Sequence, residues 1–303
     1  MRFKDMKNYF QSLLFACFIL VALNLCAESK KGKDKYISIE KLNGHKTLKM
    51  KLKSKGGHSG YCMNLMIENR GTDTCFAWVE AGRRLESADT TQQDIFIVKN
   101  EYAVIPPKSK SEFSLFGFCC ISHNRSPAKG SAFTVGMMEG KDWQTIAQLI
   151  NGHDFDESAI QAAVWVVSNG HSVSAIGKGQ NNKNMLLLQT LADIKGITMP
   201  WYNIAYASEP SRVFSNKPKS IQADITYTLA YEGVVSVLVK DAYGIVQKTL
   251  LDNVPRNKGP YVYYLDMEIG GWKDGQYELM IVQDGNRILE TRKFEINRAI
   301  SGF

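Results

Sequence analysis

The chain has 303 residues, of which 44% are hydrophobic and 22% are charged, and its formal net charge is +7 at pH 7. This length is enough for two domains that each bury a hydrophobic core of their own. The excess of positive charge is mild, so the composition gives no reason to expect a nucleic-acid partner.

The N-terminus has the composition of a secretory signal peptide. Three basic residues precede an apolar stretch: Arg2, Lys4 and Lys7, and then Ser12–Ala27. The stretch is too short and too asymmetrically flanked for a membrane span. We therefore predict a signal peptide over residues 1–27, export of the chain, and no transmembrane span after cleavage. Cys26 leaves lipidation as an alternative to ordinary cleavage after Ala27.

Removal of the signal peptide leaves four cysteines: Cys62, Cys75, Cys119 and Cys120. An even number of cysteines in an exported chain favours disulfide bonds. A bridge between the neighbours Cys119 and Cys120 requires a strained ring, so we expect each of them to pair with Cys62 or Cys75. The sequence contains no CxxC motif and no histidine at zinc spacing, so we expect no metal site and no cofactor.

Residues 28–36 are predicted to be a charged, flexible leader, and the segment after them a strand with one wet face. Its lysines alternate with less polar residues: Lys49, Lys51, Lys53 and Lys55 with Met50, Leu52 and Ser54. We interpret this pattern as an edge strand whose lysines discourage aggregation. The alternative is a binding strip for anionic polysaccharide or lipid head groups.

Residues 37–136 have the pattern of a β-sandwich. Short apolar runs alternate with tight turns: YCMNLMIEN, CFAWVEAG, DIFIVKN, EYAVIPP and SEFSLFGFCCIS. Strands at this spacing are typical of sandwich folds. Over residues 60–130 the succession of IEN, FAWVEAGRRL, VIPP and FGFCC resembles a type of bacterial extracellular Ig-like domain. This resemblance implies a fold and no particular activity.

From about Gly140 the apolar residues recur at helical spacing, which predicts a helical appendage over residues 137–207 that packs on the sandwich. Three helices are expected, in KDWQTIAQLIN, HDFDESAIQAAVWVVSNG and NNKNMLLLQTLADIKG. Asp154 and Glu157 fit a capping box at the start of the second helix, while Gly170 and Gly196 are expected to end the second and third. An irregular aromatic segment follows, and the polar, proline-containing residues 208–220 are predicted to be a linker.

The last quarter of the chain, Ile221 to Ile296, is predicted to form five or six antiparallel strands. Apolar residues alternate in two of them: Val235, Val237 and Val239 in one, and Tyr277, Leu279 and Ile281 in another. A period of two between turn residues is typical of a half-buried antiparallel sheet.

This C-terminal part, residues 221–298, resembles the Ig-like domain of the flagellar hook-capping protein FlgD and the related sorting domains of proteins exported by the type IX system. The matching features are ITYTL at Ile225–Leu229, the V-x-D-x-x-G turn at Val239–Gly244, and DGQY at Asp274–Tyr277. The resemblance implies an Ig-like β-sandwich in a Gram-negative envelope. It leaves two roles open, a structural or adhesion module and a signal read by the type IX secretion machinery.

One pair of short motifs resembles those of thioester adhesins, in which a cysteine after an aromatic residue bonds to a glutamine side chain. The glutamine motif is Ile160-Gln161-Ala-Ala-Val164-Trp165, and either Tyr61-Cys62 or Phe118-Cys119 matches the cysteine motif. The resemblance implies attack of a thiol on the Gln161 amide and release of ammonia, which leaves an acyl group reactive toward amines. The alternative is that Gln161 and its neighbours are ordinary parts of an amphipathic helix.

Two further groups of residues carry weaker signals. Trp143, Trp165, Trp201 and Tyr202 are candidates for lining a sugar-binding groove, although aromatic residues more often belong to the core. Asp154, Asp156 and Glu157 are candidate calcium ligands, although helix capping explains two of them. No common hydrolase, phosphate-binding or dinucleotide-binding motif is present, so we do not expect an enzyme.

The sequence thus predicts a mainly β protein: an N-terminal Ig-like β-sandwich with a small helical appendage, joined to a C-terminal FlgD-like Ig-like β-sandwich. We expect a non-enzymatic protein, secreted or held at the cell surface or in the periplasm of a Gram-negative bacterium. Its expected partner is a cell-surface protein or polysaccharide. The alternative function is that of a covalent thioester adhesin.

Overall fold

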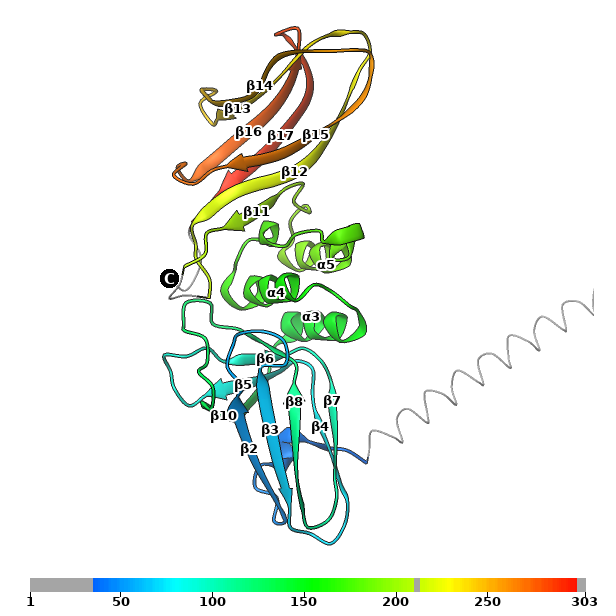
Figure 1. Cartoon of the computed structure of the whole chain (residues 1–303), viewed down its shortest axis with the longest axis vertical. Coiled ribbons are helices and arrows are strands. Elements are labelled where there is room, and N and C mark those ends of the chain that lie inside the picture. Colours follow the sequence, from blue (N-terminus) through cyan, green and yellow to red (C-terminus); the bar gives the residue numbers. More distant parts are fainter. Residues whose placement is uncertain (1–34, 210–212, 299–303) are drawn as a thin grey trace, which may run out of the picture.

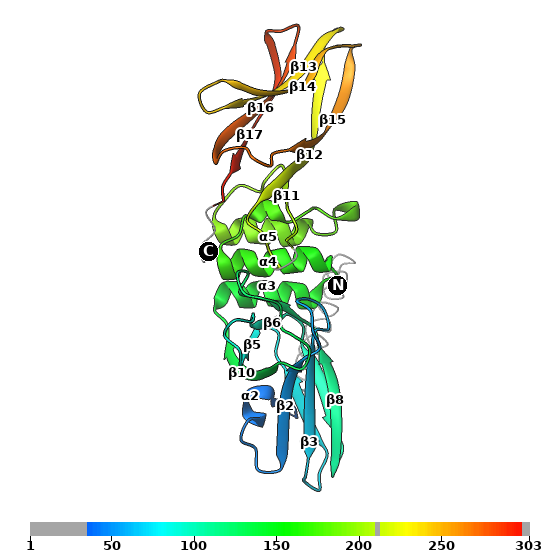
Figure 2. The ribbon, with the colours of Figure 1, turned by 60° about the vertical axis from the view of Figure 1, so that its left-hand side comes forward.

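The computed structural model describes residues 35–209 and 213–298. The predicted signal peptide and almost all of the predicted leader lie outside the described residues. The molecule is elongated: a β unit at one end, three stacked helices in the middle and a second β unit at the other end (Figures 1 and 2). The fold is mainly β, which confirms that part of the predicted fold class.

The N-terminal β unit consists of two sheets of unequal size. A three-stranded sheet has the order β1-β4-β7, and a seven-stranded sheet has the order β8-β3-β2-β10-β5-β6-β9. The elements are β1 Ile37–Ser38, α2 Ile39–Leu42, β2 Leu48–Ser54, β3 Met63–Asn69, β4 Cys75–Val79, β5 Arg83–Ser87, β6 Ile95–Ile97, β7 Glu101–Ile105, β8 Ser109–Leu115, β9 Gly117–Cys119 and β10 Ala132–Met138. Both sheets contribute apolar side chains to one core.

Strand β2 alternates as its lysine pattern predicts, but it is not an edge strand. Lys49, Lys51 and Lys53 are exposed, while Leu48 and Leu52 are buried. The strand pairs with β3 on one side and with β10 on the other. The prediction of an edge strand was wrong. A period of two indicates which face of a strand is exposed to solvent, but not which strands pair with it.

Three helices form the middle layer: α3 Lys141–Gly152, α4 Glu157–Asn169 and α5 Met185–Lys195, with the short 3₁₀ segments η1 Val173–Ala175 and η2 Gln180–Asn182 before α5. Gly170 and Gly196 end α4 and α5 in the left-handed region, at φ 69° and 64°, as predicted. Apolar residues of the helices share a core with Phe96, Phe118 and other residues on the outer side of β6 and β9. The helices therefore cover one end of the seven-stranded sheet.

The predicted capping box of α4 is not formed. The helix starts after Asp156, which makes no side-chain cap bond. Asp154 and Asp156 instead lie 3.0 and 3.4 Å from Nζ of Lys183. The Lys183 ammonium group thus pairs with two of the three candidate calcium ligands. In the described parts of the chain no three His, Cys, Asp or Glu side chains lie close enough together to hold a metal ion.

The C-terminal β unit consists of a three-stranded sheet, β11-β12-β15, and a four-stranded sheet, β14-β13-β16-β17. The strands are β11 Asn203–Tyr206, β12 Pro218–Leu229, β13 Gly233–Asp241, β14 Val246–Arg256, β15 Gly259–Glu268, β16 Gly275–Gln283 and β17 Arg287–Ile296. The alternating residues Val235, Val237 and Val239 are all fully buried in the core of this unit. The predicted antiparallel strands and their inner face are confirmed.

The join between the helices and this unit differs from the prediction. Strand β11 comes from the segment assigned to the helical appendage, yet it pairs with β12, and Ile204 lies opposite Ile221. Phe214, in the segment predicted to be a polar linker, is only 7% exposed and lies against Trp165 of α4. The segment is therefore docked on α4 through an aromatic side chain and is not a free linker.

Candidate functional site

The candidate site lies at the outer edge of strand β9, which is the last strand of the seven-stranded sheet. Strand β6 occupies its inner edge. On the outer edge the N–H groups of Gly117 and Cys119 donate to the carbonyls of Gly60 and His58, at 2.9 and 2.8 Å. In an antiparallel strand the N–H and C=O of one residue point to the same side. The carbonyls of Gly117 and Cys119 therefore also face this outer edge.

These two carbonyls hold the side chains of the thioester motifs. The Cys62 thiol donates to the Gly117 carbonyl, with Sγ 3.4 Å from the oxygen. The Gln161 amide donates through Nε2 to the Cys119 carbonyl at 2.7 Å. Carbonyls two residues apart on a strand are separated by roughly 7 Å. We call this arrangement of Cys62, Gln161 and the two carbonyls the β9 edge site.

Helix α4 places Gln161 at the site. Its apolar residues, including Ile160 and Val164, are buried in the core beneath the helices. Gln161 itself is 5% exposed, and its Oε1 is among the buried polar atoms that lack a hydrogen-bond partner. A buried amide oxygen without a partner is costly and uncommon. The Gln161 carbonyl is thus held away from water with no group bound to it.

The glycine-rich segment KGGHSG, residues 55–60, brings Cys62 to the same edge. Gly60 has a φ of 74°, which glycine adopts readily, and its carbonyl accepts from the N–H groups of both Cys62 and Gly117. The carboxylate of Glu157, in the first turn of α4, lies directly against Gly60, where an added Cβ would be 3.1 Å from Oε2. A side chain at position 60 would therefore compete with Glu157 for space.

The buried position of Cys62 determines the state of its thiol. Burial raises the pKa of Cys62 to about 12, opposed by its hydrogen bonds to backbone groups and by the charge of Lys55, while the charge of Glu157 raises it further. The group is therefore a neutral thiol at neutral pH.

The other three cysteines are placed differently. All four cysteines of the described residues are free thiols and buried. The side chain of Cys119 lies in the core between the two sheets, whereas that of Cys120 lies beneath the helices, because successive residues of a strand point to opposite faces. The predicted pairing of both neighbours with Cys62 and Cys75 is therefore corrected: Cys120 is on the wrong side of the sheet to reach either partner.

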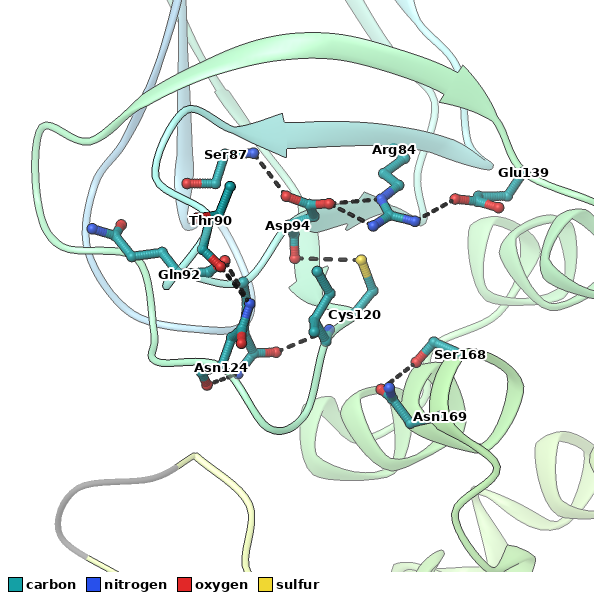
Figure 3. Close-up of polar contacts among 12 residues, drawn as sticks. Arg84, Ser87, Thr90, Gln92, Asp94, Cys120, Asn124, Glu139, Ser168 and Asn169 are labelled. Carbon is teal, nitrogen blue, oxygen red and sulfur yellow. Dashed lines mark hydrogen bonds and ion pairs between the residues drawn. The ribbon is translucent and has the colours of Figure 1, made fainter. Parts of the chain in front are cut away.

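A second polar cluster fixes the chain just beyond this site (Figure 3). The Arg84 guanidinium donates to Asp94 through Nε and Nη2, at 2.8 and 2.6 Å, and through Nη1 to Glu139 at 3.3 Å. The carbonyl of Asp94 accepts from the N–H of Cys120 at 3.0 Å. The cluster thus holds β5, β6 and the end of β9 in register. Its charged groups are paired with one another, so we assign it a structural role.

The four aromatic residues considered for a ligand groove do not come together. Trp143 packs edge-on against Phe96, with ring centroids 4.9 Å apart, beneath the helices. Trp165 packs against Phe214 and lies with it in a small separate cluster. Trp201 and Tyr202 belong to the core of the C-terminal β unit. Trp143 and Trp165 therefore lie in two separate clusters, apart from Trp201 and Tyr202, whose rings contact each other. The four residues do not line one shared groove, and that prediction is corrected.

The structure also contains a buried pair that the sequence did not reveal. Nε2 of His171 lies 2.9 Å from Oγ of Ser122, and the two residues are 3% and 1% exposed. Burial lowers the pKa of His171 to about 3, so the ring is neutral. The two residues are 49 positions apart in the sequence, and no local pattern indicated this contact. The pair resembles a nucleophile and its base, but both groups are enclosed by packing.

Comparisons with known proteins leave the family open. No family model matches the sequence, and no curated protein matches it. Among solved structures, a β-glucosidase from Kluyveromyces marxianus in complex with glucose aligns at 11% identity and a TM-score of 0.20. The alignment covers 78% of this chain and 44% of the enzyme chain. A TM-score this low carries no argument about fold or activity. Among the described residues no helix combines the length and apolar character needed to cross a membrane.

Proposed function

We propose that this protein is a secreted or cell-surface binding protein that joins Cys62 to Gln161 in an internal thioester and uses it to attach covalently to its partner. The observation that carries the proposal is the convergence of these two side chains on neighbouring outward carbonyls of β9. They are separated by 99 positions in the sequence and come from a loop and a helix. Of the two cysteines with a matching motif, Cys62 is favoured, because only its thiol binds at the same edge as Gln161.

The chemistry requires one bond exchange. The sulfur of Cys62 attacks Cδ of Gln161, the C–N bond breaks, and ammonia leaves with the thiol proton. The product is an acyl group on sulfur whose carbonyl oxygen is the former Oε1 of Gln161. Burial of both residues keeps water away from this ester. A nucleophile of the partner then displaces the sulfur, and the partner becomes attached to the side chain of residue 161.

The architecture supports a role at a surface. Gln161 of α4 contacts the N-terminal sheet at the β9 edge site. The C-terminal β unit lies on the other side of the helical layer (Figure 1). In this proposal the C-terminal unit is the FlgD-like Ig-like module that presents the site, or that is recognised by the type IX secretion machinery. The partner is a cell-surface protein or polysaccharide.

The test is the intact mass of the mature protein secreted by its own host, with and without methylamine. We expect a mass lower by one ammonia than the sequence gives, and addition of one methylamine on treatment. The variants Cys62→Ala and Gln161→Ala should show neither change, whereas Cys119→Ala should behave as the wild type. A wild-type protein with its full ammonia content and no reaction with methylamine would refute the thioester.

A second candidate function is non-covalent binding of an anionic polysaccharide or lipid head groups. Lys49, Lys51 and Lys53 are exposed on one face of β2, and Lys110 of β8 lies two strands away on the same side. Glu68 of β3 stands between Lys49 and Lys110, which weakens the positive field. Retention on a sulfated polysaccharide column that is lost in Lys51→Glu, but not in Lys195→Glu, would support this function.

A further inference from the structure

We infer that Glu157 binds the attacking amine at the β9 edge site and takes a proton from it. The inference rests on the proposed thioester between Cys62 and Gln161. It assigns a residue to the step that opens the thioester, in which the resemblance to thioester adhesins already implies attack by an amine. Polysaccharide hydroxyls are thereby disfavoured as the partner's reacting group.

The position of Glu157 is the first argument. Glu157 and Gln161 are four residues apart in α4, so their side chains leave the helix on the same face. The Glu157 carboxylate also touches Gly60, whose carbonyl accepts the hydrogen bond from Cys62 N–H at 2.8 Å. The carboxylate is therefore next to both residues of the thioester. It neighbours Gln161 on the surface of α4, and it neighbours Cys62 through its contact with Gly60 in the loop.

Exposure is the second argument. Glu157 is exposed, whereas Cys62 and Gln161 are almost fully buried. Of these three side chains, only the Glu157 carboxylate is therefore open to a group in solvent. Within the described parts of the chain Glu157 makes no ion pair, while the nearby Lys55 ammonium donates to Oγ of Ser114 at 3.0 Å. The carboxylate is thus available to an incoming cation.

The third argument is the proton balance of the opening step. An alkylammonium group binds the carboxylate and passes one proton to it, which yields the neutral amine. The amine nitrogen attacks Cδ of residue 161, the C–S bond breaks, and a C–N bond forms. The sulfur of Cys62 leaves as a thiolate and takes the second proton lost by the nitrogen. An amide to the partner and a free thiol result, with no oxidant or co-reactant.

A carboxylate at this point discriminates between nucleophiles. It attracts an ammonium ion and repels a carboxylate or sulfate, so acidic polysaccharides are kept from the acyl carbon. A hydroxyl group carries no positive charge that the carboxylate could bind. Its proton is also too weakly acidic to be transferred to the carboxylate before attack. Buried Oε1 of Gln161, which lacks a hydrogen-bond partner, becomes the oxygen of the thioester carbonyl, and the nitrogen attacks the carbon of that carbonyl.

The experiment compares the wild type with Glu157→Gln and with the matched control Asp142→Asn. Asp142 is also an exposed carboxylate in the first turn of a helix, α3, but α3 contributes no residue to the β9 edge site. Each purified protein is first weighed for loss of ammonia and then treated at neutral pH with methylamine, which is cationic, or hydroxylamine, which is neutral. The rate of adduct formation is followed by intact mass.

We expect all three proteins to lose ammonia. Glu157→Gln should react with methylamine roughly 10²-fold more slowly than the wild type, the contribution typical of a general base, and at the wild-type rate with hydroxylamine. Asp142→Asn should match the wild type with both reagents. Unchanged methylamine rates in Glu157→Gln, or equal slowing with both reagents, would overturn the role of Glu157 while leaving the thioester standing. Absence of ammonia loss in the wild type would overturn the thioester and this inference together.

Discussion

The amide of Gln161 donates to the carbonyl of Cys119 at 2.7 Å, and this hydrogen bond joins helix α4 to the outer edge of strand β9. The bond is buried, so its loss leaves a carbonyl without a partner and without water. In the background of Cys62→Ala, where no thioester forms, Gln161→Ala should lower the free energy of unfolding by about 1–3 kcal/mol. Urea denaturation measures this.

The control for that experiment is Gln148→Ala, also in the Cys62→Ala background. Gln148 is exposed on α3, so its removal should change stability by no more than about 0.5 kcal/mol. Equal losses for the two variants would show that the bond between Gln161 and Cys119 contributes nothing to stability.

Comparison of Gly60→Ala with Gly44→Ala should separate the effect of backbone strain from the effect of displacing the Glu157 carboxylate. Gly60 and Gly44 both have positive φ, 74° and 90°, so alanine at either position should cost about 1–2 kcal/mol of stability. Nothing lies within 4 Å of a Cβ added at Gly44, whereas at Gly60 it would press on the Glu157 carboxylate. Because that carboxylate ends a flexible side chain, it should move aside. Only Gly60→Ala should therefore slow the reaction with methylamine, measured by intact mass.

His171 should make the protein less stable in acid. Burial holds the pKa of its ring at about 3, below the 6.5 of an exposed histidine, so the unfolded chain binds a proton that the folded chain does not. The stability from this group is complete above pH 6.5 and is lost as the pH falls from there toward 3. The loss approaches about 4–5 kcal/mol at most, at 1.36 kcal/mol per unit.

Denaturation between pH 7 and pH 4 tests this expectation. His171→Gln, which keeps a polar partner for Ser122, should show a smaller decrease in stability over that range than the wild type. His45→Gln, at an exposed position, should follow the wild type. A wild-type slope retained in His171→Gln would mean that other groups, such as paired carboxylates, cause the acid sensitivity.

Phe214 should be important for joining the helices to the C-terminal β unit. Its ring lies 5.4 Å from that of Trp165 and 4.0 Å from that of His171, centroid to centroid. Phe214→Ala should cost about 3–5 kcal/mol, as is usual for a buried aromatic residue. Tyr243→Ala is the control, because Tyr243 is 89% exposed at the β13–β14 turn. Thermal denaturation that leaves the two variants equally stable would contradict the docking role.

The sequence predicted well where local periodicity determines the structure. The strands of the C-terminal unit alternate as expected, and Val235, Val237 and Val239 are buried in its core. The three helices and the glycines that end two of them were also predicted correctly. In each case the evidence lies within a few residues, because side-chain direction repeats every 2 or 3.6 residues.

Predictions that depended on distant partners were less successful. The cysteine count suggested two disulfides, but the pleat of β9 sends the side chains of Cys119 and Cys120 into different cores. The lysines of β2 suggested an edge strand. However, β10, which comes last in the sequence of the N-terminal unit, pairs with β2 on its other side. Neither the composition nor the local pattern of a strand indicates which other strands pair with it in the sheet.

The sequence by itself determined the mainly β fold, the three helices, and two short motifs in which Cys62 or Cys119 was a candidate partner of Gln161. Only the tertiary structure shows which of those cysteines has its thiol at the same strand edge as the Gln161 amide. Residues Gly117 and Cys119 direct their carbonyls to the outer edge of β9, and Cys62 and Gln161 both bind there. The physical reason is that an edge strand has hydrogen-bonding groups that its own sheet does not satisfy, so distant segments must fold onto them.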